Sequence, residues 1–183
     1  MATTVLPPFG EITRSTPATA TSGSLSVKEW GGDSLRITEV TVSALPLVTP
    51  AGAAALAGGH LLTTLPAGNI CIKSCVINLN LLEASGSTNA AKTPDLGVGT
   101  SVGAGANATL NAVDSGKAEN IMTGQTASAL NATTRTINSV NTILAIPSAN
   151  AHTIYLNCAD TWAGAGGAVI ADGKVVIEWC LLD

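Results

Sequence analysis

The sequence feature that most constrains this chain is a nine-residue run at positions 174–182, KVVIEWCLL. Its apolar residues follow the two-residue period of a β-strand, and one face is formed by Val175, Ile177, Trp179 and Leu181. Each of these side chains contributes roughly 1.5–3 kcal/mol when it is fully buried, so the strand needs a second layer to pack against. The run therefore predicts a core strand in one of two facing β-sheets.

A turn signal stands directly before this run. Asp172 and Gly173 form an Asp-Gly pair, which is typical of a tight hairpin turn when apolar runs lie on both sides. We therefore expect residues 168–170 and 174–182 to form a hairpin that closes the fold.

Similar runs recur along the chain between segments rich in Gly, Pro and Asn. In residues 35–48 the alternation changes phase near Glu39 and Val40, which indicates a bulge or two short strands. Gly97 and Gly99 lie inside another short run and indicate a bend or the close approach of another backbone. The remaining expected strands span residues 60–65, 69–83, 95–102, 136–146 and 152–158. About eight strands within residues 35–183 predict a single antiparallel β-sandwich domain of jelly-roll type, with another sandwich topology as the alternative.

Residues 1–34 differ from the rest of the chain, because three prolines and a Thr/Ser/Ala/Gly-rich run leave no core periodicity. They predict an extended N-terminal arm outside the 35–183 domain. Isolated apolar side chains can fix such an arm on a neighbouring chain. Folding back on its own domain is an equally open alternative. The candidate partner-binding residues are Leu6, Phe9, Ile12 and Trp30.

The surface chemistry suggested by the composition is polar but poor in charge. Only 11% of residues are charged while 46% are hydrophobic, which suits a protein that packs against neighbours and favours a homo-oligomer, most simply a trimer. A Thr/Asn-rich extracellular-style β protein is the alternative. The net charge of −4, without a basic cluster, argues against nucleic-acid binding. No apolar run approaches the ~20 residues of a membrane helix, and the N-terminal residues do not resemble a signal peptide. We therefore expect no membrane contact, and assembly in a cytoplasm.

The four cysteines are expected to be free thiols. Cys71 and Cys75 fall on the same face of one expected strand, about 13 Å apart at ~3.3 Å per residue, whereas a disulfide needs Cα atoms within roughly 7 Å. No second pair of ligands accompanies them to complete a zinc site. Cys158 and Cys180 lie in apolar strands and are expected to behave as small buried hydrophobic residues.

No residue pattern predicts catalysis, so we expect no enzyme activity, no cofactor and no metal. His60 and His152 lie outside any metal or nucleophile motif. The segment GVGTSVG at positions 97–103 lacks the lysine and the following helix of a phosphate loop. Trp162 lies in a glycine-rich loop, where it either anchors its own loop, as we expect, or stacks on a sugar.

The C-terminal segment 154–183, IYLNCADTWAGAGGAVIADGKVVIEWCLLD, resembles the ending of structural proteins encoded beside the capsid genes of tailed bacteriophages. Their shared pattern is a strand, an Asn, Ala-Asp-Thr-Trp, a loop of small residues, and a last strand with an aromatic residue. The resemblance implies a capsid decoration, or cement, protein. Such a protein is a jelly roll, often trimeric, that lies on the capsid exterior and braces neighbouring copies of the major capsid protein. One alternative is a carbohydrate-binding jelly-roll module of a phage fibre, which would require aromatic side chains clustered on one exposed surface. The other is a major-capsid-like subunit, which normally has a longer chain.

Overall fold

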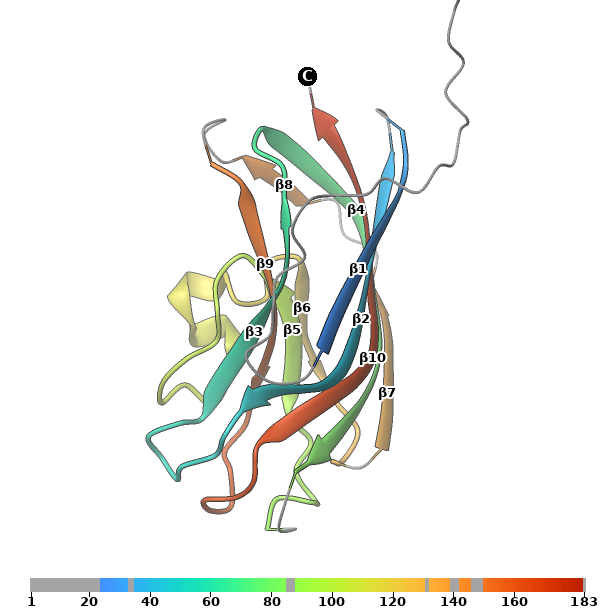
Figure 1. Ribbon diagram of the computed structural model, residues 1–183. Helices are drawn as coiled ribbons and strands as arrows, with labels where there is room; N and C mark the ends of the chain where they lie inside the picture. The colour runs from blue at the N-terminus through green and yellow to red at the C-terminus, as the bar shows by residue number, and fades with distance from the viewer. Residues whose placement is uncertain are drawn as a thin grey trace, which may run out of the picture.

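The chain folds as a β-sandwich (Figure 1). A computed structural model describes residues 24–32, 35–84, 88–130, 132–138, 142–145 and 150–182. Within them lie ten strands in two antiparallel sheets and two short 3-10 helices, which confirms the predicted all-β class.

The larger sheet has six strands in the order β1-β2-β10-β4-β7, and β8 also pairs with β4. Its strands are β1 (Ser24–Gly31), β2 (Arg36–Val48), β4 (Asn69–Glu83), β7 (Ala132–Asn138), β8 (Thr142–Ala145) and β10 (Val169–Leu182). The smaller sheet has four strands in the order β3-β9-β5-β6. These are β3 (Ala57–Leu65), β5 (Asp95–Gly99), β6 (Met122–Thr126) and β9 (His152–Ala159).

The strand order is that of a jelly roll. β7 and β8 pair with successive stretches of β4 and so act as one interrupted strand. When β1 is set aside, the chain supplies β2, β4, β7/β8 and β10 to one sheet and β3, β5, β6 and β9 to the other. The sheets then read β2-β10-β4-β7 and β3-β9-β5-β6, two interleaved sets of four as in a jelly roll. The count is ten instead of about eight because β1 and β6 were not predicted and the predicted strand 136–146 is divided between β7 and β8, while residues 168–170 and 174–182 join into β10.

β1 changes the expected division between arm and domain. Its eight residues pair with β2 from Ser24 opposite Ser43 to Gly31 opposite Arg36. Leu25 and Val27 pack on the core, and Glu29 is buried. The described part of the range 1–34 is thus the edge strand of the domain, and the expected boundary at residue 34 falls inside a hairpin. Residues 1–23 lie outside the described residues.

The last strand, β10, has the buried inner face that the sequence predicted, but it does not form the predicted hairpin. Val175, Ile177 and Trp179 are fully buried, and Leu181 packs against the same core. However, residues 168–170 and 174–182 do not form a hairpin, because β10 runs through Asp172 and Gly173 while it pairs with β4 on one side and β2 on the other. The Asp-Gly pair lies inside a continuous strand, opposite a bulge in β2.

Two bulges shift the inward-facing positions. Opposite Asp172, the phase of β2 changes at Ala44, whose φ is 48° and whose N–H donates to Asp172 Oδ1 at 2.8 Å. The sequence predicted this phase change near Glu39 and Val40. That position is wrong, because the extra residue of β2 is Ala44, whose N–H is bound by Asp172. In β4 the register shifts beside Lys73.

The shift beside Lys73 separates the two cysteines of β4. Cys75 remains in the core, whereas Ile70 and Ile72 take the inward positions before the bulge. Cys71 therefore lies on the other face of the sheet, and the expectation that Cys71 and Cys75 share a face is wrong.

Candidate interaction surface

The outer face of the smaller sheet is covered by the chain's own loop between β5 and β6. This loop contains the 3-10 helices η1 (Leu110–Ala112) and η2 (Asp114–Gly116), which lie outside β9 and β3 in Figure 1. Asn157 of β9 is fully buried beneath the loop. Its Oδ1 accepts from the Gly103 N–H at 2.7 Å, and its Nδ2 donates to the carbonyls of Ser101 and Ala118 at 3.0 and 2.7 Å. One amide side chain thus fastens three points of the loop to the sheet.

The loop approaches β5 closely because of the two glycines noted in the sequence. A Cβ at Gly99 would lie 2.2 Å from the Lys117 carbonyl oxygen, and one at Gly97 would lie 2.9 Å from Leu110. The close approach predicted for this run is confirmed. A small separate apolar cluster fills the space beneath the loop: Ala57, Leu110, Val113, Ala118 and Ala159.

The outer face of the larger sheet has no such cover among the described residues and carries an apolar patch. Strand alternation places the patch residues opposite the core side chains of β1, β2, β10 and β4. Trp30 pairs with Ile37 across β1 and β2, and Cys180 pairs with Cys71 across β10 and β4. We call this set the outer patch: Trp30, Leu35, Ile37, Cys71, Cys180 and Leu182.

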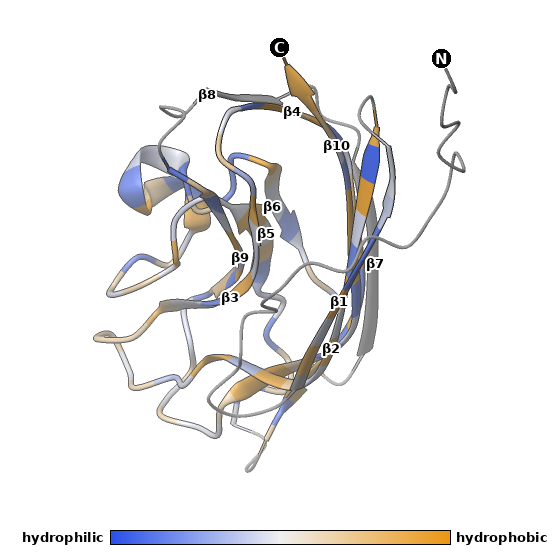
Figure 2. Cartoon of the chain, turned by 45° about the horizontal axis from the view of Figure 1, so that its top comes forward, coloured by the Kyte–Doolittle hydropathy of each residue, from blue (hydrophilic) through white to orange (hydrophobic). Residues whose placement is uncertain are grey.

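Two residues of the outer patch are strongly exposed to solvent. Leu35 and Leu182 are 41% and 39% exposed, and they are two of the three large exposed hydrophobic residues among those described. The third, Val102 at 43%, lies in the loop on the other side of the sandwich. Figure 2 shows the hydrophobic C-terminal end of β10 at the same end of the molecule as the β1–β2 hairpin.

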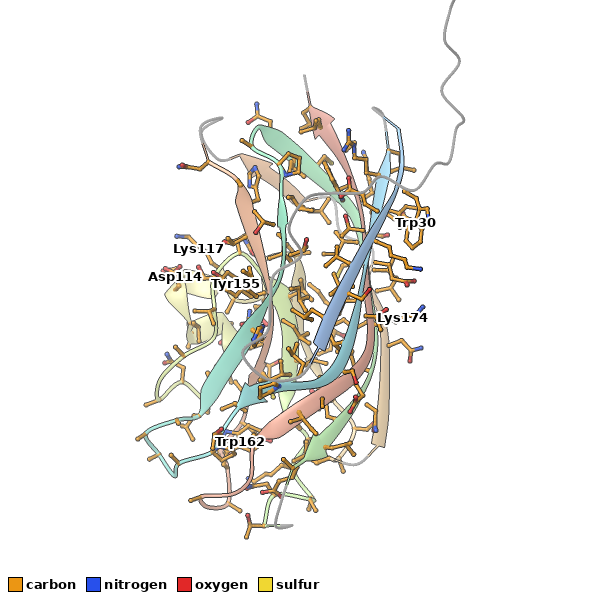
Figure 3. The ribbon with its side chains drawn as sticks, viewed as in Figure 1. Trp30, Asp114, Lys117, Tyr155, Trp162 and Lys174 are labelled. Atoms are coloured by element: carbon orange, nitrogen blue, oxygen red, sulfur yellow. The ribbon has the colours of Figure 1, made fainter. Side chains whose placement is uncertain are left out.

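Of the four predicted partner-binding residues, the structure places Trp30. It projects from β1 on the side away from the smaller sheet, as does Lys174 of β10 (Figure 3). Leu6, Phe9 and Ile12 lie outside the described residues. The sequence pattern did not indicate Leu35 or Leu182 as surface residues, nor that the buried Cys71 and Cys180 pair on the outer face, although the alternation of β10 already places Cys180 and Leu182 on its second face.

A polar network on the inner side of the sheet supports the strands that carry the patch. Glu29, which is 2% exposed, accepts from Arg36 Nη1 at 3.1 Å and from Thr38 Oγ1 at 3.4 Å. Trp179 Nε1 donates to Thr38 Oγ1 at 2.9 Å, and the Arg36 guanidinium lies 5.5 Å from the centre of the Trp179 ring. β1, β2 and β10 are thereby joined directly behind Trp30 and Ile37.

A polar cavity of about 450 Å³ lies at the other sheet and is lined by carboxylates and threonines. Asp95 Oδ2 accepts from the Leu110 N–H at 2.9 Å, and Asp160 lies 3.9 Å from Lys92 Nζ, so both carboxylates hold the chain itself. Burial raises the pKa of the nearby Glu119, and the charge of Asp95 adds to this effect. Across the described ranges, no group of three or more His, Cys, Asp or Glu side chains is placed to hold a metal ion.

Trp162 and His152, which the sequence analysis considered as binding or catalytic residues, are both buried and hydrogen-bonded to the backbone. Trp162 is 7% exposed and its Nε1 donates to the Leu56 carbonyl at 3.0 Å, which confirms it as an anchor of its loop. His152 is fully buried at the start of β9, with Nε2 2.6 Å from the Gly68 carbonyl oxygen. The described aromatic residues do not gather on one surface, because Trp179 is also buried and Trp30 and Tyr155 lie on different sheets.

Neither the protein-family models nor the curated proteins contain a match. Among solved structures, the chain is similar to a chain of the cyanophage Pam1 capsid asymmetric unit, with a TM-score of 0.43 and 16% identity over 93% of this chain and 94% of that one. A likeness at this level assigns neither a family nor a function. No helix in the described part of the chain is long and apolar enough to cross a lipid bilayer.

Proposed function

We propose that this protein decorates the exterior of a tailed-phage capsid and stabilises it by bracing neighbouring copies of the major capsid protein. The observation that carries the proposal is the difference between the two outer faces of the sandwich. The loop fastened by Asn157 covers one face, whereas none of the described residues covers the apolar patch on the other. A subunit that functions beside others gains stability when such a patch is covered, and an isolated soluble domain gains nothing from it.

The composition and the N-terminal segment support the same role. A chain with 46% hydrophobic and only 11% charged residues suits permanent contact with neighbours. Residues 1–23 carry Leu6, Phe9 and Ile12 in a polar, proline-containing context. Each apolar anchor contributes roughly 1.5–3 kcal/mol when it is fully buried in a neighbour's groove. Many copies on one shell multiply this attachment by avidity.

Binding to capsids that lack the protein tests the proposal. The full chain should co-sediment with undecorated capsids of the phage that encodes it, and a chain without residues 2–23 should bind at least tenfold more weakly. The deletion stops at residue 23 because β1 supplies Leu25, Val27 and Glu29 to the folded domain. Circular dichroism should show the same β content in both proteins. Capsid binding by the truncated chain as tight as that of the full chain would place attachment elsewhere, and no binding by the full chain would refute the decoration role.

A further inference from the structure

We propose that the outer patch is the docking site for residues 1–23 of a second copy of this chain. The inference rests on the proposed function in one respect, since it names the partner that the N-terminal segment binds. None of the described residues covers the patch. Leu35 and Leu182 are 41% and 39% exposed in the single chain, and Trp30 and Ile37 beside them are only partly buried.

The chemistry of the N-terminal segment fits the patch. Residues 1–23 contain two charged residues, Glu11 and Arg14, and their apolar side chains are spaced along an otherwise small and polar stretch. An extended peptide of this kind binds a sheet face by placing single side chains between those of the sheet. Glu178, whose register places it between Ile37 and Ser74 and in line with Trp30, offers a carboxylate to Arg14 at one edge of the patch.

The length of the segment allows it to reach a neighbour. It joins the domain at Ser24, whereas the patch lies at the Gly31 end of β1, about 23 Å away at ~3.3 Å per residue. Leu6 precedes Ser24 by 18 positions (24 minus 6) and Ile12 by 12 (24 minus 12). Extended chain of these lengths spans roughly 40–60 Å, which is enough to cross to the patch of an adjacent copy.

The geometry also predicts how the copies assemble. A segment of one subunit bound to a patch on the next is a heterologous contact, because the two surfaces differ. Such contacts close into rings when the rotation allows it, and a ring of three agrees with the trimer expected from composition. Each subunit in the ring then gives one segment and receives one.

Full-length variants test the exchange in solution, without capsids. A segment variant carries Leu6→Ser, Phe9→Ser and Ile12→Ser, and a patch variant carries Leu35→Ser and Leu182→Ser. Val102→Ser is the matched control, since Val102 is equally exposed at 43% but lies outside the patch. Sedimentation velocity should show an oligomer for the wild type and the control, and association at least tenfold weaker for the segment and patch variants.

Mixing the two variants decides whether the contact joins different copies. The segment variant retains its patch and the patch variant retains its segment, so an equimolar mixture should associate where neither variant does alone. Fluorescent labelling of one variant identifies the mixed species. A mixture that associates no better than its components overturns the inference. If the wild type is a monomer in solution but both variants still lose capsid binding, the occupant of the patch is a capsid protein; the inference then fails while the proposed function stands.

Discussion

At the scale of single residues, two ion pairs with nearly equal distances occupy opposite environments. Glu29 and Arg36 lie 3.1 Å apart on the inner side of the larger sheet, with side-chain exposures of 2% and 20%. Lys174 and Glu39 lie 3.0 Å apart on the outer side, with exposures of 53% and 21%. The first pair is removed from water and linked to Thr38, whereas the second is screened by solvent.

We predict that Glu29→Ala lowers the free energy of unfolding by about 2–4 kcal/mol, because it leaves the Arg36 charge partly buried without its carboxylate. The matched variant Glu39→Ala should cost less than about 1 kcal/mol, since exposed pairs contribute little. Urea titration followed by tryptophan fluorescence measures both changes. Equal effects of the two substitutions would show that the inner network does not stabilise the fold.

At the scale of elements, the bulge of β2 opposite Asp172 bears on how the last strand pairs. A hairpin at Asp172 and Gly173 would have ended the strand after a few residues. β10 instead pairs with β2 and β4 along its length, and Asp172 accepts from the Ala44 N–H that the bulge in β2 leaves free. Gly173 has a φ of 138°, and a Cβ there would lie 2.2 Å from the Asn78 carbonyl oxygen.

We predict that Gly173→Ala destabilises the protein by more than about 2 kcal/mol, because it combines backbone strain with a clash against β4. Gly164→Ala is the control, since no atom lies within 4 Å of the Cβ position in that loop. Its effect should stay within about 0.5 kcal/mol. Thermal unfolding by calorimetry compares the two variants. A Gly173→Ala protein as stable as the control would mean that the bulge relaxes without loss.

At the scale of the whole molecule, the buried thiols make the stability of the sandwich core depend on pH. All four cysteines are free and buried, as expected from the sequence. Burial raises the pKa of Cys75 from 9.0 to about 12, and burial also raises the pKa of Cys158, with further contributions from Asp160 and Asp95. Both thiols belong to the core between the sheets. They stay protonated in the folded protein at pH values where the unfolded chain has begun to ionise.

We predict that the free energy of unfolding falls as pH rises above about 9, the ordinary thiol pKa. Below that pH both states hold the protons, so these groups give no pH dependence. Above it the unfolded chain loses protons first, and each buried thiol lowers stability by up to about 1.4 kcal/mol per pH unit. Urea titrations from pH 8 to 11 should show this fall. A Cys75→Ala/Cys158→Ala protein should show a shallower one, and identical slopes would contradict the assignment.

The sequence by itself determined the all-β class and the inward face of the last strand, and it limited Gly97 and Gly99 to a bend or a close approach, because these follow from side-chain alternation and residue size within one segment. Only the tertiary structure decided which strands are neighbours. That choice kept the Asp172–Gly173 pair inside a continuous strand, opposite a bulge in β2, since the strand finds partners on both sides and Asp172 accepts from the Ala44 N–H. It also moved Cys71 to the outer face through the bulge beside Lys73 and joined β1 to the sheet. The outer patch arises in the same way: its side chains come from four strands, and no single segment shows that they meet on a face the chain's described residues leave uncovered.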